Sequence, residues 1–447
     1  MLKPVLSKST YIRSLQCLKS LYLYKNYFLQ RDKISVEQQA VFNRGHAVGN
    51  VAHQLFPGGL DASKGVKQRS KDALLRTLDL IQKGEKIIYE ASFQHDGVWV
   101  IADIIVLEET GYKVYEVKSS LSISDTYLND AALQYYVISN ALKQINNLAL
   151  LDFILVYVNK NYVLKDAFDV KRYFLFREMK TYCEEQNDFV QSRIIRAKLT
   201  LDNGKIPAVD TGEHCFNPYP CDFQGTCFKS AAKPETLQIN NTGLNTFFNT
   251  DEKVYVLDWL TTRPAIPMFE NTQPYQTVAF QFSIADINNA KMEVQFVAEN
   301  SGNPNTIFIE QLIKNTATPG IILVSDYTSK CNALQELSEF YPQYAVPLSV
   351  IKQRLKPVTD FFISDDKAVS LQAIHQLLKI KTIETKDLIK NKTEASNAFL
   401  EMQQVNDLFK NMELSDALNH FGKSNISKLL YIIEQLKNAS KSVITNS

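Results

Sequence analysis

Two acidic residues and a lysine occupy the apolar segments of this chain in a spacing that suits hydrolytic chemistry. Asp103 lies within VWVIADIIVLE (98–108), and Glu116 and Lys118 end YKVYEVK (112–118). A carboxylate in such surroundings is costly unless a positive charge pairs with it. If the two segments pair as strands, the carboxylates can hold a divalent cation and the lysine can aim a water molecule. The pattern predicts a hydrolytic metal site.

Three further residues are candidates for the same site. His53 follows Gly49 in a predicted helix, and imidazole is a suitable additional ligand for Mn²⁺. Glu90 lies in the preceding strand-like segment, and Gln134 lies on a helix after the acidic pair. Each has an ordinary alternative: a packed helical histidine, an edge-strand acid and a surface glutamine.

The periodicity of apolar residues predicts the elements that position these side chains. Helices come first, then three strands joined by tight turns, then a helix and a fourth strand. This order predicts an α/β domain with a mixed sheet and helices on its faces. The expected helices are 9–30, 35–56, 69–83 and 125–143, followed by a basic helical region at 165–200, and the expected strands are 86–93, 98–107, 112–118 and 150–159.

Four cysteines suggest a second site. Cys215, Cys221 and Cys227 lie in a proline-rich loop (207–232), and Cys17 lies alone on the first predicted helix. Loop cysteines beside prolines have little reason to exist for packing, so a bound metal or cluster is favoured. Four thiolates suit either zinc or an iron–sulfur cluster, although the C-x₂-C pairs of zinc ribbons are absent.

The composition limits the number of domains but does not identify a binding partner. The chain has 447 residues, 45% hydrophobic and 22% charged, which predicts two or three folded domains. The 49 basic and 48 acidic residues give a net charge of +1, which neither requires nor excludes nucleic acid. The start has no signal-peptide pattern, and the most apolar stretch (148–158) is too short to span a membrane, so a cytoplasmic protein is expected.

In combination, these residues resemble the iron–sulfur-stapled RecB-like branch of the PD-(D/E)XK nucleases, which includes AddB-type recombination nucleases and CRISPR-adaptation exonucleases. The resemblance covers about residues 5–230. The family's Q-x-x-x-Y is altered here, because Ile138 takes the tyrosine position after Gln134. The resemblance implies a structural [4Fe–4S] cluster and a catalytic Mg²⁺ or Mn²⁺. The implied cluster ligands are Cys17, Cys215, Cys221 and Cys227; the implied metal ligands are His53, Asp103, Glu116 and the Val117 carbonyl; Lys118 is implied as catalytic, with Gln134 in support.

The second half of the chain resembles an RNase H-like DEDD exonuclease, in the stretch at 254–283. Such enzymes carry D-x-E at the end of the first strand, but Leu260 follows Asp258 here, and the last acid is replaced near Asn425. Because two-metal chemistry needs several carboxylates, this domain is expected to be catalytically inactive, with Asp258 a polar residue at a strand end. The expected organisation is a nuclease domain (1–232), a linker (233–243) and a degenerate RNase H-like domain (244–447).

The function expected from these patterns is metal-dependent hydrolysis of DNA, on single strands or ends, in repair or defence. One alternative is a catalytically weak protein of the same fold that binds nucleic acid or docks a protein partner through its second domain. Another is a zinc-stapled scaffold without hydrolytic function.

Overall fold

The chain forms two compact units. The first comprises Met1–Tyr162 and Asp166–Ala232, and the second comprises Val163–Lys165 and Lys233–Ser447. The computed structural model describes residues 6–145, 148–228, 237–240, 244, 247–248, 252–287, 292–298, 302–364, 369–380 and 388–444. Of the predicted linker, residues 233–236 and 241–243 lie outside the described residues, and Leu237–Ile239 form a strand of the second unit.

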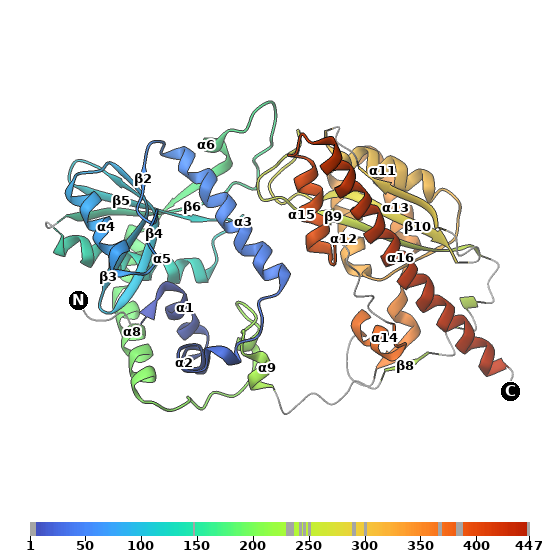
Figure 1. Ribbon diagram of the computed structural model, residues 1–447, viewed down its shortest axis with the longest axis horizontal. Helices are drawn as coiled ribbons and strands as arrows, with labels where there is room; N and C mark the ends of the chain where they lie inside the picture. Colours follow the sequence, from blue (N-terminus) through green and yellow to red (C-terminus); the bar gives the residue numbers. More distant parts are fainter. Residues whose placement is uncertain are drawn as a thin grey trace. The chain divides into compact units, whose positions relative to one another are not determined.

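The first unit alternates helices and strands (Figure 1). Its strands are β1 (Leu6–Ser7), β2 (Leu60–Asp61), β3 (Ile87–His95), β4 (Val98–Leu107), β5 (Gly111–Lys118), β6 (Ala149–Val158) and β7 (Phe174–Glu178). Its helices are α1 (Lys8–Gln16), α2 (Leu18–Asn26), α3 (Val36–Ala52), α4 (Lys71–Gln82), α5 (Asp125–Gln144), α6 (Val170–Tyr173), α7 (Lys180–Glu185), α8 (Asn187–Asp202) and α9 (Gln224–Cys227), with 3₁₀ turns η1 (Phe28–Gln30), η2 (His53–Leu55) and η3 (Glu213–Cys215).

These strands form one mixed sheet in the order β2-β3-β4-β5-β6-β7. The pairs β3–β4, β4–β5 and β6–β7 are antiparallel, whereas β2–β3 and β5–β6 are parallel. The short strand β1 pairs in parallel with the start of β4, on the side where β5 pairs with the end of β4. The predicted mixed α/β sheet with flanking helices is therefore confirmed.

Helix α5 is the central helix of this unit. It packs on β3, β4 and β6, and α1, α7 and α8 pack against it. A helix covered on both sides must be apolar around most of its circumference. Ala131, Leu133, Val137 and Leu142 are accordingly buried in the same core as the strand residues. Polar residues that α5 turns toward the sheet are held rigidly in that core.

Two predictions for this unit are wrong in detail. The helix expected at 9–30 is broken at Cys17, where the backbone is extended (φ −160°, ψ 118°). Its side chain accepts a hydrogen bond from the Ser20 backbone N–H at 3.4 Å, so Cys17 ends α1 and caps α2. The basic region expected to be helical contains the strand β7, which pairs with β6 at the sheet edge.

The second unit is also a sheet with helices on both faces. Its main sheet has the order β11-β10-β9-β12-β13, and β14 pairs with β8. Its elements are β8 (Leu237–Ile239), β9 (Val254–Thr262), β10 (Val278–Asp286), β11 (Met292–Val297), α11 (Pro304–Asn315), β12 (Ile321–Val324), α12 (Tyr327–Phe340), η4 (Pro342–Tyr344), α13 (Ala345–Arg354), β13 (Leu355–Pro357), η5 (Val358–Phe361), β14 (Phe362–Ser364), α14 (Leu371–Leu377), α15 (Lys392–Met402) and α16 (Leu408–Ile444).

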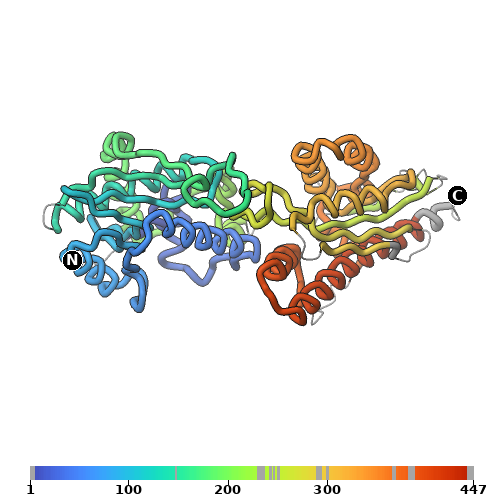
Figure 2. Tube along the Cα trace, turned by 90° about the horizontal axis from the view of Figure 1, so that it is seen from above, coloured from blue at the N-terminus to red at the C-terminus, as the bar shows by residue number. Residues whose placement is uncertain are grey.

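Alternation along β9 divides the core of this unit in two. Tyr255, Leu257 and Trp259 are in a core cluster with residues of α11, α12 and α13, whereas Val256 and Leu260 face residues of α15 and α16. Figure 2 shows α16 running along one face of the strands and the α12–α13 pair on the other. The apolar segments 254–260, 278–284 and 320–326 predict the strands β9, β10 and β12, whereas the strands β8, β11, β13 and β14 are not predicted.

Within the described residues, every helix is too short or too polar to cross a lipid bilayer.

We expect Gly111→Ala to destabilise the first unit by about 1–3 kcal/mol, because an added Cβ would overlap the Ala149 carbonyl of the adjacent strand. The measurement is urea unfolding followed by fluorescence in a Trp259→Phe background, where Trp99 is the single remaining tryptophan of two. Gly45→Ala is the control: its Cβ meets no neighbour within 4 Å in helix α3, so it should stabilise by about 0.5–1 kcal/mol. Equal changes in the free energy of unfolding for the two variants would contradict the close approach of Gly111 to the Ala149 carbonyl.

Candidate functional site

Three adjacent strands bring three carboxylates to one level of the first sheet. The β3–β4 register pairs Tyr89 with Ile104 and Ala91 with Ala102, which places Glu90 opposite Asp103. The β4–β5 ladder ends at Ile104 and Tyr115, so the next residues along, Asp103 and Glu116, also face each other. The predicted acids 90, 103 and 116 therefore lie on neighbouring strands.

The backbone is irregular at this level of the sheet. Glu90 has a φ of +53°, a left-handed conformation that a non-glycine residue adopts at a cost. Asp103 lies between the residues of β4 that pair with β1 and those that pair with β5. Its Oδ2 atom accepts a hydrogen bond from the Val117 N–H at 2.7 Å, so a side chain takes the place of a backbone acceptor. The irregularity opens the sheet around the acids.

Two lysines converge on Glu116. Its Oε1 atom accepts hydrogen bonds from Lys118 Nζ and from Lys8 Nζ, each at 2.8 Å. The side chain of Glu116 is 1% exposed, that of Lys118 is 10% exposed and that of Lys8 is 32% exposed. Lys8 is therefore the outermost member of the group, and it comes from the first residue of α1.

Helix α5 supplies a fourth acid. Lys118 Nζ makes a short ion pair with Asp130 Oδ2, and Lys8 Nζ lies 3.6 Å from the same atom. Gln134, one turn later, donates from Nε2 to Asp130 Oδ1 at 3.4 Å and is fully buried. Gln134 is thus connected to Lys118 through Asp130, which contacts both.

The electrostatics of the site are dominated by burial and crowding. Burial and the Glu116 carboxylate raise the pKa of Asp103 to about 8. Burial, Glu116 and Asp61 raise the pKa of Glu90 to about 7. Burial alone would raise the pKa of Glu116, but the ammonium groups of Lys118 and Lys8 outweigh it and lower the pKa to about 2. The two lysines therefore do not offset burial and repulsion at Asp103 and Glu90, and both carboxyl groups resist ionisation.

His53 lies on the turn that ends α3 and contacts strand β3. Its ring stacks on Tyr89, with centroids 3.9 Å apart and planes 5° from parallel. Tyr89 precedes Glu90 in β3 and also hydrogen bonds to the Phe56 carbonyl. Burial lowers the pKa of His53, against the attraction of Asp61, and the neutral imidazole is the form that binds metals. The structure therefore fixes the His53 ring against the strand of Glu90.

Among the described side chains, no group of three or more His, Cys, Asp or Glu is arranged to hold a metal ion. The donor chemistry nevertheless suits Mg²⁺ or Mn²⁺, which prefer carboxylate oxygens. Glu116 Oε2 is buried without a hydrogen-bond partner in the described structure. An orphaned carboxylate oxygen beside two acids of raised pKa is a place where a cation relieves both burial and repulsion.

All four predicted cysteines line one pocket of the first unit. Cys17 lies between α1 and α2, and the others lie on the loop that ends this unit. None of the four forms a disulfide. The remaining lining residues are Lys19, Ser20, Val209, Asp210, Thr211, His214, Phe223 and Gln224.

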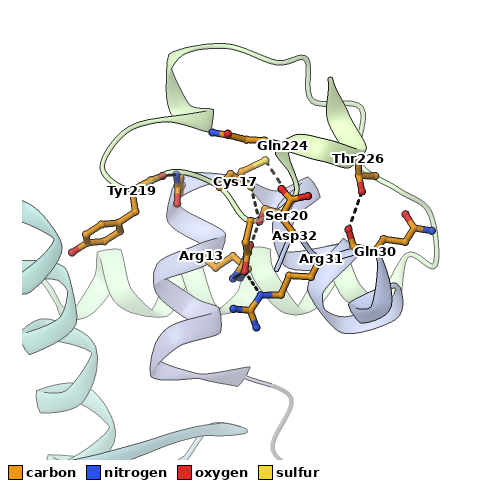
Figure 3. A network of polar contacts seen from close by, with 12 residues as sticks. Arg13, Cys17, Ser20, Gln30, Arg31, Asp32, Tyr219, Gln224 and Thr226 are labelled. Atoms are coloured by element: carbon orange, nitrogen blue, oxygen red, sulfur yellow. Dashed lines mark hydrogen bonds and ion pairs between the residues drawn. The ribbon is translucent and has the colours of Figure 1, made fainter. Parts of the chain in front are cut away.

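A polar network fastens the loop to the first two helices (Figure 3). Arg13 makes a two-pronged ion pair with Asp222, at 2.5 and 3.0 Å, and also donates to Ser20 Oγ at 2.7 Å. Gln16 Nε2 donates to the carbonyl oxygens of His214 and Tyr219 at 2.8 and 2.7 Å. These contacts hold the ends of the unit together, and the Cys221 thiol adds a contact to Ser20 Oγ at 3.5 Å.

The thiols interact electrostatically with one another. Burial raises the pKa of Cys17, and the neighbouring Cys221 and Cys215 raise it further. Burial also raises the pKa of Cys227, Lys19 opposes this, and the other three thiols add to it. Ionising several of these thiols together is unfavourable without a cation, so the pocket has the donor set that a metal or an iron–sulfur cluster requires.

In the second unit, Asp258 is not at a strand end as predicted. It lies in the middle of β9, 3% exposed, where Lys330 Nζ pairs with its Oδ1 at 2.7 Å. Asn425 of α16 donates to its Oδ2 at 3.1 Å. Leu260 is buried in the apolar core. The carboxylate of Asp258 is thus ion-paired with a lysine and hydrogen-bonded to an amide.

Sequence reasoning missed Lys8 and Asp130. Asp130 carries a recoverable signal, because it lies four residues before Gln134 on a helix and shares its face. Lys8 carries no such local signal, since it meets Glu116 from 108 positions away.

The match to a family of known sequences falls in the second unit. Residues 255–385 match the sequence model of a family described as "Domain of unknown function (DUF2779)". No curated protein shows significant sequence similarity to the chain. Among solved structures, one titled "Crystal structure of SSO0001" matches at 13% identity over 51% of this chain and 87% of that chain, with a TM-score of 0.26.

We expect Asp103→Asn to stabilise the first unit in the presence of a chelator, by an amount that grows as the pH rises from about 4 to about 8. The pKa of Asp103 is about 8 in the folded chain against an ordinary value of 3.8. Between these values the folded state keeps a proton that the unfolded state has lost, so the free energy of unfolding falls with rising pH. The asparagine removes this contribution.

The measurement is thermal unfolding of both proteins at several pH values in EDTA. Asp79→Asn, an exposed acid of α4 paired with Lys83, serves as the control and should show no such trend. Parallel stability curves for Asp103→Asn and the parent protein would show that Asp103 ionises normally.

Proposed function

We propose that the first unit is a metal-dependent nuclease of the PD-(D/E)XK type that hydrolyses DNA phosphodiesters. The observation that carries this proposal is the set of three facing carboxylates at positions 90, 103 and 116 with Lys118 bound to the last. Asp103, Glu116, the Val117 carbonyl and His53 would hold Mg²⁺ or Mn²⁺. The bound ion would supply Lewis-acid activation of the phosphate and a nucleophilic water.

Four side chains around the proposed ion have the remaining roles in this proposal. Lys118 is buried and held between Glu116 and Asp130, so its ammonium group has a fixed direction. A fixed ammonium can orient a water molecule and offset the negative charge that grows on the phosphate. Gln134 and Asp130 position Lys118. Glu90 adds negative charge at the rim of the ion site.

We further propose that the four-cysteine pocket binds a structural [4Fe–4S] cluster. Support comes from four thiols in one pocket, drawn from segments about 200 residues apart, next to a protein-only network that already fastens these segments. Closing so long a loop contributes about 5 kcal/mol in the chain-entropy model. A zinc ion in the same pocket is the competing assignment.

For the second unit we propose a degenerate RNase H-like domain without hydrolytic activity, serving as a docking domain. The support is that Asp258 is paired with Lys330 and Asn425. A lysine ammonium at 2.7 Å occupies the side of the carboxylate that a metal would otherwise need.

The nuclease proposal predicts that anaerobically purified protein cleaves labelled DNA in Mn²⁺, single-stranded or at duplex ends, and that Lys118→Met lowers the rate by about 100-fold or more. Asp103→Ala should abolish cleavage. Lys113→Met is a matched control, because Lys113 lies on the same strand but pairs with Glu108 away from the site, and it should cleave normally. Binding of Mn²⁺ and DNA without cleavage would instead favour a nucleic-acid-binding protein of the same fold.

The cluster proposal predicts that the native protein is brown and contains iron and sulfide, and that Cys221→Ala removes the colour and leaves much of the protein insoluble. Cys331→Ala, in the second unit, should change neither property. Native protein that is colourless and contains one equivalent of zinc would show that the pocket binds zinc instead of the cluster.

A further inference from the structure

The ammonium group of Lys8 is placed where an approaching DNA strand would meet the site. It is more exposed than the other lysine of the cluster around Glu116, at 32% against 10% for Lys118. Its partners Glu116 and Asp130 are almost fully buried, so Lys8 covers them from the solvent side.

Neutralising Glu116 does not require Lys8. Lys118 already donates to Glu116 Oε1 at 2.8 Å, and Lys8 binds the same oxygen atom while Oε2 has no hydrogen-bond partner among the described residues. Two donors on one oxygen, with the other left free, is a poor arrangement for a purely structural ion pair. This arrangement suits a site in which Glu116 Oε2 faces a cation and one of the two lysines binds a second anion.

Charge counting points to the same conclusion. The four acids of the site carry four negative charges when ionised, and the two lysines with one divalent ion carry four positive charges. The site is therefore balanced before substrate enters. A bound phosphodiester adds one negative charge to the site. The ammonium group of Lys8, the more exposed of the two lysines, can then leave Glu116 and contact this phosphate.

The position of Lys8 is fixed by the backbone on both sides. Before it, β1 pairs with β4 through Leu6 and Ser7, and Ser7 caps α1 by a capping box with Thr10. At its far end α1 stops at Cys17 in the four-cysteine pocket. Helix α1 thus connects the pocket to the acids.

Two tyrosine side chains lie near Lys118. Lys118 Nζ lies 5.1 Å from the centre of the Tyr127 ring. Tyr219, 47% exposed on the cysteine loop, interacts electrostatically with Tyr127, Lys118 and Asp130. Exposed aromatic rings beside ammonium groups are the pattern that binds single-stranded nucleic acid, through base stacking and phosphate contacts.

We propose that Lys8 is a second lysine of the nuclease site, which leaves Glu116 to contact a phosphate of a bound single strand. This inference rests on the proposed function and assigns to it a substrate contact.

The test is binding of a labelled single-stranded DNA in Ca²⁺ at several salt concentrations, together with cleavage in Mn²⁺, for Lys8→Met, Lys8→Gln and Lys8→Arg. A lost phosphate contact reduces the slope of log affinity against log salt by about 0.7. We expect this reduction, and a loss of cleavage of about tenfold or more, in the Met and Gln variants, with recovery in the Arg variant. Lys83→Met, an exposed lysine of the same unit, should behave as the parent protein.

The Gln variant separates a substrate contact from a structural role, because glutamine can still donate to Glu116 but carries no charge. Recovery of binding and cleavage by Lys8→Gln would overturn the proposal, as would an unchanged salt slope in every Lys8 variant. If the parent protein binds DNA with a Lys8-dependent slope but never cleaves it, the nuclease assignment fails and the phosphate contact stands. If the parent protein does not bind the strand, both fail.

Discussion

The first unit is organised around the cost of burying carboxylates side by side in one sheet. Glu90, Asp103 and Glu116 face one another on adjacent strands, and two of the three have raised pKa values because like charges and burial oppose ionisation. Such repulsion weakens a fold unless other elements compensate for it. The surrounding architecture supplies positive charge from two directions, Lys118 from within the sheet and Lys8 from the first helix.

The same constraint explains the placement of the helices. Helix α5 is buried on both sides, so the few polar residues it turns inward, Asp130 and Gln134, have defined partners at the site. Helix α1 reaches the acids at its start and the cysteine pocket at its end. The two regions are therefore joined by a single helix.

The sequence predicted those features whose signal is local. The apolar segments that became β3, β4, β5 and β6 were located to within one or two residues. The acidic pair was expected on facing strands because a tight turn joins those strands. The break at Cys17 lacks the usual sequence signal, because cysteine is not among the preferred helix caps, although its sulfur accepts the Ser20 N–H as a serine hydroxyl would.

The features that were missed depend on distant partners. Strand β7 is mostly exposed and exists because β6 offers an edge, which no pattern within its five residues reveals. Strand β1 has two residues and is defined only by pairing with β4. Lys8 follows β1, and its contacts with Glu116 and Asp130 form only in the folded chain.

The separation of the cysteines along the chain also has a consequence for biosynthesis. Cys17 leaves the ribosome long before Cys227, so a nascent chain exposes one thiol of the pocket while its three partners have yet to be made. Under the cluster proposed for this pocket, delivery of iron and sulfide would succeed only after the last helix of the first unit has emerged. Insertion of the proposed cluster would therefore belong to the end of synthesis of this unit, and early oxidation of Cys17 would prevent it.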